Sequence, residues 1–587
     1  MTVLDAGGQY CHLIARKVRD LGVYAEVAPS ETRAGDLAGR RGIIVSGGPA
    51  SVYDAGSPTI DPQLLRAGVP VLGICYGQQL MAHLLGGTVQ RGERGEYGFA
   101  QLEIASDAGR IFREIAPRQQ VWMSHRDLVT RPPEGFHVLA RTETCAVAAM
   151  ADAAKRLYAV QFHPEVAHTP CGTQILSNFL FDVCGCATDW DPAGQIQGVE
   201  DRIREVAGAR SVFFFVSGGV DSTVAYTLCL RALTPERVHG LYVDTGLMRE
   251  GETEFVRANF AALGAKAFAV HDASAEFLGA LAGAVEPERK RHIIGEEFVR
   301  VQQQTLDSEH YLDGHWILGQ GTIYPDTIES GGTAKSELIK THHNRVAGIQ
   351  RLIEEGRIVE PLANFYKDEV RAIGRELGLS PALLERHPFP GPGLAIRCLC
   401  ADGGGGLEND GGAPEKSPDG WVLPVRSVGV QGDSRTYRSV LAIEDFPASQ
   451  EEAASLINRN DRVNRVVAEV WTAAPVAQMR ARPAALSRER LARLRRADAI
   501  VRSMTHDSGF DHFVWQLPVV LIPFGLDGRP DSIVLRPINS VDGMTASVVR
   551  MPKGLLAEIA AQLKAVEGVA GVFYDLTNKP PGTIEWE

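Results

Sequence analysis

The chain has 587 residues, and its 60 Lys and Arg against 72 Asp and Glu give a formal net charge of −12. At roughly 100–200 residues per domain, this length predicts about three to five domains. The acidic balance argues against nucleic acid as a partner, because proteins that bind its phosphates need a basic surface. The longest apolar runs are far shorter than the ~20 residues of a membrane span. Nine cysteines without paired C-x-x-C sets indicate a reduced, cytoplasmic protein.

Residues 1–186 alternate short apolar strands with helical stretches, which is typical of βαβ units. The fold class predicted here is α/β, with a doubly wound and mostly parallel sheet. The clearest strands cover residues 2–5, 42–46, 69–74 and 157–162. Residues 187–199 contain Asp-Pro and glycine and predict a linker.

A second doubly wound, mostly parallel α/β domain is expected over residues 200–397, with strands at 211–216 and 239–244. It ends in the PFPGPG stretch at 388–393, which can be neither a helix nor a central strand. Residues 398–420 are rich in glycine, proline and acidic residues, and they predict a flexible insertion.

The last part of the chain contains a diverged repeat. Two stretches recur 94 residues later, Leu423-Pro424-Val425 as Leu517-Pro518-Val519 and Val440-Leu441 as Val534-Leu535. In each copy two strands are followed by a helical stretch and a third strand. We therefore expect an α+β C-terminal region with two tandem ββαβ-like units, at residues 421–510 and 511–587.

The sequence Gly73-Ile74-Cys75-Tyr76-Gly77 follows an apolar strand and precedes a helical run. Glycines beside a cysteine at such a turn permit a nucleophile elbow, and the helix N-terminus favours a thiolate and a developing oxyanion. His163 and Glu165 end another strand, where His163 can serve as the base and Glu165 can orient its ring. Gly48 can supply a further amide to the oxyanion. A lone cysteine or histidine would be better interpreted as a core or turn residue, but the combined pattern favours catalysis.

The loop Ser217–Ser222 follows the strand at 211–216 and opens a helix. Its N–H groups, its hydroxyls and the helix dipole favour a bound phosphate, and Asp221 suits a Mg²⁺ ion that bridges phosphates. It is not a Walker A loop, and a glycine-rich loop alone is most often only a tight turn. The adjacent histidines within residues 340–344 do not predict zinc, because neighbouring side chains point apart on most backbones.

The stretches GGQY (7–10), SGGP (46–49), GICYGQQ (73–79), MSHRD (123–127) and HPE (163–165) resemble the class I glutamine amidotransferases. The resemblance implies that glutamine is hydrolysed through a thioester on Cys75, with release of ammonia. It implies a catalytic triad of Cys75, His163 and Glu165. The oxyanion-hole and glutamine contacts that it implies are Gly48, Tyr76, Gln79, Ser124 and His125.

The stretch SGGVDS is similar to the signature of the N-type ATP pyrophosphatases, which cleave ATP between its α and β phosphates and adenylate an acceptor. The resemblance implies Mg²⁺ as the cofactor, held by Asp221. The ATP contacts that it implies are Ser217, Gly218, Gly219, Val220, Asp221 and Ser222.

The ending KPPGTIEWE, together with IYPDTIES, KTHHN, HPFPGPGL and VRSVGVQGD, resembles the GMP synthetases, and the resemblance covers nearly the whole chain. It implies adenylation of XMP by ATP and amination by ammonia, with XMP, ATP and glutamine as the small-molecule partners. It also places Lys290 in a mobile lid. The residues that it implies for XMP binding or adenylation are Asp326, Glu329, Lys340, Lys579, Ile584 and Glu585.

Two features depart from this family pattern. Gly571 stands where relatives commonly carry an arginine that helps to hold the substrate phosphate, and Arg465 takes the comparable place in the first repeat. The C-terminal region is also longer than in the compact bacterial form, whose single unit mediates dimerisation. A second copy in the same chain could cap that surface, so monomer and homodimer both stay open, and the pattern favours the monomer.

Other functions also stay open. An adenylating amidotransferase could use another acceptor, although the C-terminal motif argues against this. A regulatory protein could bind guanine nucleotides on an inactive scaffold, although the complete triad and phosphate loop argue against that. A tRNA-thiolating enzyme shares the ATP loop, but the acidic balance and the amidotransferase motifs count against it.

Overall fold

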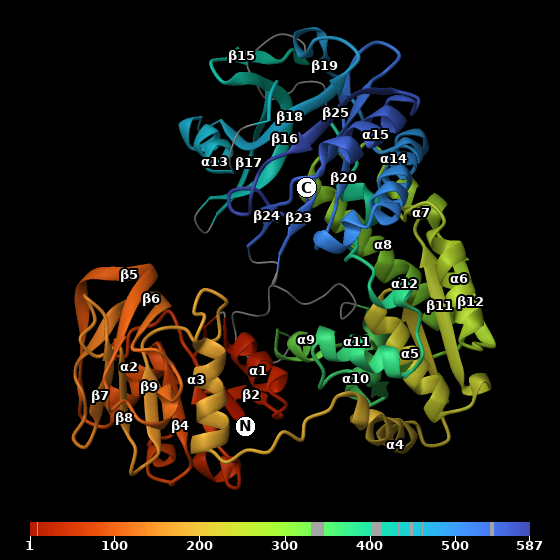
Figure 1. The fold of residues 1–587 in the computed structure, drawn as a ribbon. Coiled ribbons are helices and arrows are strands. Elements are labelled where there is room, and N and C mark those ends of the chain that lie inside the picture. Colours follow the sequence, from red (N-terminus) through yellow and green to blue (C-terminus); the bar gives the residue numbers. More distant parts are fainter. Residues whose placement is uncertain are drawn as a thin grey trace. The chain divides into compact units, whose positions relative to one another are not determined.

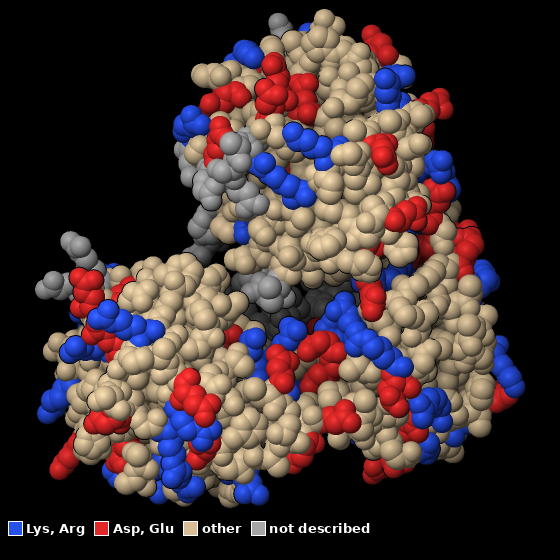
Figure 2. Space-filling model, in the orientation of Figure 1, with Lys and Arg blue, Asp and Glu red and all other residues tan. Residues whose placement is uncertain are grey.

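The computed structural model of the chain is drawn in Figure 1, and its described residues are 1–8, 10–329, 346–401, 412–431, 434–446, 450–460, 462–540 and 545–587. These residues divide into two compact units, 1–195 and 196–587. Across the same ranges, no helix is both long and apolar enough to cross a membrane. On the face shown in Figure 2, basic and acidic side chains are interspersed rather than gathered into a continuous basic band.

The first unit is built on a nine-stranded sheet in the order β2-β1-β3-β4-β9-β8-β7-β5-β6. The first five of these strands are parallel, as predicted, and the remaining four extend the sheet in antiparallel fashion. Strands β3, β4 and β9 are buried along their whole length, which is typical of parallel strands covered on both faces. The strands are β1 (Thr2–Asp5), β2 (Glu26–Pro29), β3 (Ile43–Val45), β4 (Val71–Ile74), β5 (Thr88–Ile104), β6 (Arg118–Arg131), β7 (His137–Arg141), β8 (Ala149–Asp152) and β9 (Leu157–Val160), and the helices are α1 (Cys11–Asp20), α2 (Tyr76–Leu84) and α3 (Gly172–Asn178).

The second unit begins with a five-stranded parallel sheet in the order β12-β11-β10-β13-β14. Its strands are β10 (Ser211–Val216), β11 (Val238–Asp244), β12 (Ala267–Asp272), β13 (Trp316–Gly319) and β14 (Ile358–Val359). Its helices are α4 (Ile196–Ala207), α5 (Val220–Ala232), α6 (Glu252–Ala262), α7 (Ser274–Ala280), α8 (Pro287–Ser308), α9 (Tyr324–Glu329), α10 (Ala347–Glu354), α11 (Lys367–Glu376) and α12 (Pro381–Leu384). The strand order reverses between β10 and β13, which is where open α/β sheets bind their ligands.

The predicted tandem repeat is present in the C-terminal part of the second unit. Its copies are β16 (Gly420–Gln431), β17 (Ser434–Ile443), α13 (Gln450–Arg459) and β18 (Val463–Thr472), then β20 (Val519–Ile522), β22 (Asp531–Leu535), α15 (Lys553–Lys564) and β25 (Val569–Asp575). In both copies the first two strands are antiparallel and the third is parallel to the second. Antiparallel pairing of β18 with β25 joins the copies into one seven-stranded sheet, β15-β16-β17-β18-β25-β22-β20.

One hydrophobic core connects the two parts of the second unit. It joins side chains from the parallel sheet and α8 with side chains from the C-terminal sheet, α13, α15 and the long helix α14 (Arg488–Asp507). A second core on the opposite face of the C-terminal sheet contains the fully buried Trp586. The C-terminus is therefore part of the packed interior of this unit.

Two boundaries differ from those predicted. Helix α4 starts at Ile196, inside the predicted linker 187–199. The predicted insertion 398–420 is folded at both ends, because Cys398 pairs with Leu521 of β20 and β15 (Glu415–Ser417) pairs with β16. The glycine content of this range indicated a flexible segment, whereas Cys398–Cys400 is buried. Residues 402–411 lie outside the described residues.

Candidate active sites

Cys75 lies at a sharp turn between β4 and α2. Its backbone has φ 54° and ψ −106°, a region that residues with side chains rarely adopt. Glycines allow the elements around it to approach closely. A Cβ atom at Gly77 would lie 2.4 Å from the Val45 carbonyl oxygen, and one at Gly73 would lie 2.6 Å from the Gly77 backbone. The local sequence thus forms the predicted nucleophile elbow.

His163 follows β9, the parallel neighbour of β4, so it and Cys75 lie at the same edge of the sheet. Gly47 lies beside both, because a Cβ there would meet His163 Cε1 at 3.2 Å and Cys75 Cβ at 3.5 Å. His163 Nδ1 lies 2.7 Å from Oε1 of the fully buried Glu165. Burial alone would lower the pKa of His163, but the Glu165 carboxylate and the Cys75 thiol raise it to about 10. The raised pKa favours the imidazolium form of His163, which suits the base of a nucleophilic cysteine.

Strand β6 lines the same site. The Ser124 carbonyl oxygen lies 3.7 Å from Cys75 Sγ, and the Asp127 carbonyl accepts a 2.7 Å hydrogen bond from Gln79 Nε2. Both ring nitrogens of His125 are engaged, Nδ1 by the Asp127 carbonyl at 3.0 Å and Nε2 by a carboxylate of β5 at 2.9 Å. The ring therefore has no nitrogen left for glutamine, and His125 instead holds the segment between Ser124 and Asp127.

Gly48 and Tyr76 would contribute backbone N–H groups to the oxyanion hole. Tyr76 is the first residue of α2, and the first N–H groups of a helix have no intrahelical acceptor. Its side chain is buried, with the hydroxyl donating to the Pro58 carbonyl at 2.6 Å. A Cβ at Gly48 would lie 2.3 Å from the Ala6 carbonyl oxygen, so only glycine fits this loop.

The structure adds two residues that sequence reasoning missed. Gln161 Nε2 lies 3.6 Å from Cys75 Sγ, and Gln161 Oε1 accepts from Gln79 Nε2 at 3.3 Å. The ring of Tyr10 meets the ring of His163 edge-on, with centroids 5.3 Å apart. Gln161 had a signal in the sequence, because it stands two residues before His163 and so shares its direction from an extended chain.

The second site lies at the strand-order reversal of the five-stranded sheet. The loop after β10 is held together by Ser217 Oγ, which lies 3.1 Å from Ser222 Oγ and accepts from the Gly219 N–H at 3.3 Å. Gly218 has φ +72°, and a Cβ there would meet Val256 at 2.4 Å. The loop opens α5 at Val220, so the helix dipole and the first N–H groups of this helix favour an anion there.

Two acidic side chains and a lysine meet beside this loop. Asp221 forms an ion pair with Lys367 at the start of α11, and Asp221 Oδ1 is buried without a hydrogen-bond partner among the described residues. Burial raises the pKa of Asp326 in α9, and the nearby Asp221 carboxylate adds to the effect. An orphaned carboxylate oxygen beside a second carboxylate is a donor set that fits Mg²⁺. Lys367 gave no sequence signal, because it is 146 residues from Asp221.

The C-terminal tail is held by buried arginines. Arg397 Nε and Nη2 donate to the two carboxylate oxygens of Glu585 at 3.0 and 2.7 Å. Arg536 donates to the carbonyls of Ile584 at 2.9 Å and Thr583 at 2.8 Å, and Arg465 Nη2 donates to the same Thr583 carbonyl at 2.9 Å. The predicted XMP residues Ile584 and Glu585 are thus anchored in the second unit.

The lid position expected for Lys290 and the repeat equivalence of Arg465 with Gly571 were both wrong. Lys290 does not lie in a lid: it is fully buried in α8 and paired with Glu587. Arg465 is equally buried, and it binds the tail rather than presenting its charge to a ligand. In the sheet Arg465 lies opposite Val440, whereas Phe573 lies opposite the equivalent Val534, so its counterpart is Phe573 rather than Gly571.

The remaining predicted residues are Lys579, Glu329 and Lys340. The backbone N–H of Lys579 donates to the Ala546 carbonyl at 2.8 Å, which fixes the start of the tail. Glu329 is the last residue of α9. Lys340 lies outside the described residues.

Comparison with known proteins agrees with this division. Family models match at residues 2–183 (glutamine amidotransferase class-I), 195–280 (NAD synthase) and 503–586 (GMP synthase C terminal domain). The fold and the two sites thus define a glutamine amidotransferase joined to an ATP-using synthetase. The chain is 41% identical to the probable GMP synthase (glutamine-hydrolyzing) of Leptospira interrogans over 608 aligned positions, covering 100% of this chain and 99% of the relative. It is 40% identical to the enzyme of Streptomyces coelicolor and 39% identical to that of Thermobifida fusca, each match covering 100% of this chain and 97% of the relative. The chain belongs to the family of glutamine-hydrolysing GMP synthases.

Proposed function

We propose that this chain hydrolyses glutamine to ammonia, adenylates XMP with ATP, and aminates the adenylate to GMP with release of AMP and diphosphate. The observation that carries the proposal is that one chain contains both a Cys75–His163–Glu165 constellation and a phosphate loop at a sheet switch point. The family to which the chain belongs is named for this reaction.

In the first unit, His163 accepts the thiol proton of Cys75 as the sulfur attacks the amide carbon of glutamine. Backbone N–H groups of Gly48 and Tyr76 hold the oxyanion, and His163 gives its proton to the leaving nitrogen, so ammonia departs and a thioester stays on Cys75. His163 then takes a proton from water, which hydrolyses the thioester to glutamate. Glu165 orients the imidazole and stabilises its charged form.

In the second unit, residues 217–222 bind the phosphates of ATP. The C2 oxygen of XMP attacks the α phosphate, and diphosphate leaves. Ammonia then attacks C2, and AMP leaves in place of a poor oxygen leaving group. Asp221 and Asp326 would hold Mg²⁺, which when bound screens the phosphate charge and stabilises the departing diphosphate.

We assign XMP binding to Lys579, Ile584 and Glu585 in the tail. Lys579 would pair with the substrate phosphate, and the other two would contact the nucleotide. Glu329 and Lys340 are assigned to adenylation together with Asp326. The support for these roles is the match of the C-terminal domain family over residues 503–586 and the anchoring of the tail by Arg397.

We further propose a cytoplasmic monomer. The pairing of β18 with β25 within one chain uses the edge that a single copy would offer to a second chain. Light scattering after gel filtration should give a mass near 63.5 kDa, and twice that mass would show a dimer.

The decisive experiment follows the products with XMP, ATP, Mg²⁺ and a nitrogen donor. The wild-type chain should form GMP from glutamine or ammonia, whereas Cys75→Ala should form it from ammonia alone. Glutamine hydrolysis without GMP would indicate another acceptor, and absence of both activities would indicate a regulatory protein.

A further inference from the structure

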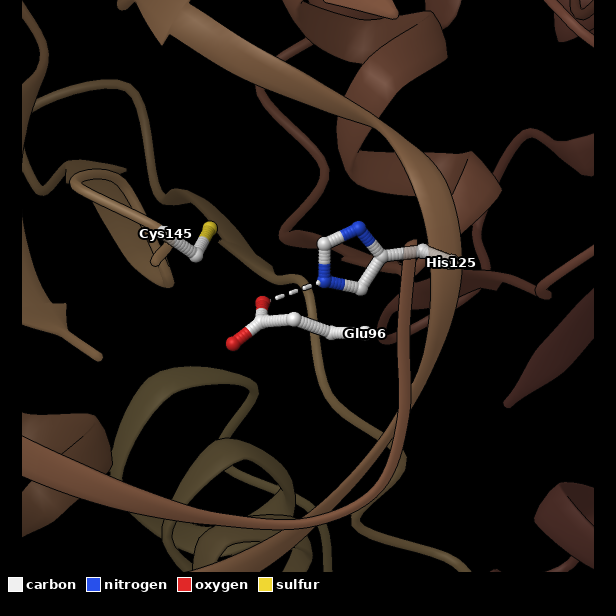
Figure 3. Close-up of side chains that lie close together, drawn as sticks. All are labelled: Glu96, His125 and Cys145. Carbon is white, nitrogen blue, oxygen red and sulfur yellow. Dashed lines mark hydrogen bonds and ion pairs between the residues drawn. The ribbon is translucent and has the colours of Figure 1, made fainter. Parts of the chain in front are cut away.

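Three potential metal ligands meet behind the glutamine site in the first unit. Glu96 of β5, His125 of β6 and Cys145 of the loop between β7 and β8 have ligand atoms that all lie within 4.8 Å of one another. Figure 3 shows the Cys145 side chain beside the hydrogen-bonded pair of Glu96 and His125. Cys145 is fully buried, and the side chains of His125 and Glu96 are 3% and 15% exposed. None of these three side chains takes part in the proposed steps of glutamine hydrolysis or GMP formation.

The orientation of His125 suits a metal ligand. Because the Asp127 carbonyl can only accept, the hydrogen of the neutral ring is assigned to Nδ1, which lies 3.0 Å from it. This leaves the lone pair of Nε2 directed at Glu96 Oε2, 2.9 Å away. Two acceptors at this distance need a positive centre between them, either a proton or a metal ion. Metal-binding histidines typically donate their other nitrogen to a carbonyl in this way.

The other two ligands are also held by a second layer of hydrogen bonds. Glu96 Oε1 accepts from the hydroxyls of Thr142, at 3.0 Å, and Thr144, which leaves Oε2 for a ligand. The Thr142 hydroxyl also accepts from the Cys145 N–H at 3.0 Å, so one threonine ties the carboxylate to the cysteine loop. A tetrahedral site with bonds of about 2.0–2.3 Å separates its ligand atoms by about 3.5 Å. On metal binding, the two ligand atoms that lie farthest apart would therefore need to approach each other by little more than about 1 Å.

We propose that Glu96, His125 and Cys145 bind a divalent ion of borderline softness, with Zn²⁺ the best fit, and that this ion inhibits the glutaminase. One oxygen, one nitrogen and one sulfur ligand with a fourth position for water suit Zn²⁺ better than Mg²⁺ or Ca²⁺, which prefer oxygen alone.

The inhibitory effect follows from the neighbours of His125, and it rests on the proposed function. Ser124 before it places a carbonyl 3.7 Å from Cys75 Sγ, and the Asp127 carbonyl after it binds Gln79 as well as His125. An ion that draws His125 toward Cys145 moves the segment that carries both contacts. Ammonia-driven synthesis does not use this segment, so it should be unaffected.

Cobalt binding tests the site without reference to activity. Co²⁺ added to the metal-free full chain should produce the near-ultraviolet thiolate charge-transfer band, and Zn²⁺ should displace it. Cys145→Ser should abolish the band, whereas Cys184→Ser, another buried thiol of the first unit, should keep it. Thr144→Val removes only a hydroxyl that donates to Glu96, and it should weaken Co²⁺ binding by about 10–100-fold. This variant tests the site even if Cys145→Ser fails to fold.

Activity measurements test the inhibition. Zn²⁺ should lower glutamine-driven GMP formation in the wild type and leave ammonia-driven formation unchanged, and Cys145→Ser should need more than about 100-fold more Zn²⁺ for the same loss. A missing cobalt band, or one lost in Cys184→Ser instead, would overturn the metal site. Equal Zn²⁺ sensitivity of Cys145→Ser and wild type would overturn the inhibition. Absence of glutaminase activity in metal-free wild type would instead refute the proposed function.

Discussion

Asp575 is the counter-charge of two buried arginines, and Asp575→Asn tests how the C-terminal tail is held. Its Oδ2 atom accepts from Arg465 at 3.0 Å, Arg536 at 2.8 Å and Trp586 Nε1 at 2.8 Å. All four side chains are fully buried. The substitution keeps the shape of Asp575 but leaves two guanidinium groups without their carboxylate.

The expected cost of this substitution is large. Removing one partner of a buried ion pair costs about 3–5 kcal/mol. Because Arg465 and Arg536 also donate to carbonyls of the tail, we expect the cost to appear as release of residues 583–587. At about 1.4 kcal/mol per factor of ten, the released population should rise by about 10²–10⁴-fold.

The initial rate of carboxypeptidase digestion reports this release when opening is fast relative to cleavage. Asp575→Asn should be digested about 10²–10⁴-fold faster than the wild type. It should also lose ammonia-driven synthesis, while glutamine hydrolysis in the first unit persists. Glu415→Gln is the matched control, because it breaks a surface pair with Arg462 in the same sheet, worth about 0–1 kcal/mol. Unchanged digestion and synthesis in Asp575→Asn would refute the assigned role of the buried charges.

Acid should release the tail in the wild type by the same mechanism. Burial would raise the pKa of Asp575, but Arg536 and Arg465 outweigh this and lower it below the usual 3.8. The stabilisation is therefore fully present above the ordinary carboxyl range, and it is lost as the pH falls through the lowered folded value. Carboxypeptidase digestion should accelerate in that range only in proteins that retain Asp575.

Three further predictions concern both units. Glu165→Gln should lower glutamine-driven synthesis by roughly 10²–10⁴-fold without changing the ammonia-driven rate, and equal losses in both assays would contradict the triad. Gly77→Ala places a methyl group 2.4 Å from the Val45 carbonyl, so it should disable glutaminase by displacing the elbow; normal glutaminase kinetics would disprove this packing. Burial raises the pKa of Glu587 from 4.5 to about 7, although the nearby Lys290 acts to lower it. The folded state therefore binds this proton more tightly than the released tail does. Tail docking should weaken as the pH rises from about 4.5 to about 7. Glu587→Gln should remove this pH dependence of carboxypeptidase digestion, and its persistence would assign it to another group.

The glutaminase elbow was predictable because short-range sequence determines it. The glycines beside Cys75 fix the turn, and the strand that precedes His163 brings it to the same edge of a parallel sheet. The sequence could not indicate that the ring of His125 is bonded to Glu96 and to the Asp127 carbonyl. Its role depends on a carboxylate 29 residues away, on a neighbouring strand.

The contacts of the C-terminal tail were not predictable, because they join residues far apart in the chain. Arg397 and Glu585 are 188 residues apart, and neither sits in a local pattern that indicates the other. Lys290 was interpreted as a lid residue on the family resemblance, which does not show whether the side chain is buried. Its burial depends on Glu587, which supplies the opposite charge inside the core. The repeat could be found from its spacing, but the pairing of β18 with β25 depends on tertiary packing.

ATP converts the C2 oxygen of XMP into a good leaving group, so that nitrogen from glutamine can replace it. Mass spectrometry of the products from XMP labelled with ¹⁸O at C2 and glutamine labelled with ¹⁵N in its amide tests both halves at once. The account predicts ¹⁵N in the amino group of GMP and ¹⁸O in the phosphate of AMP. GMP without ¹⁵N, or ¹⁸O recovered in orthophosphate instead of AMP, would contradict it.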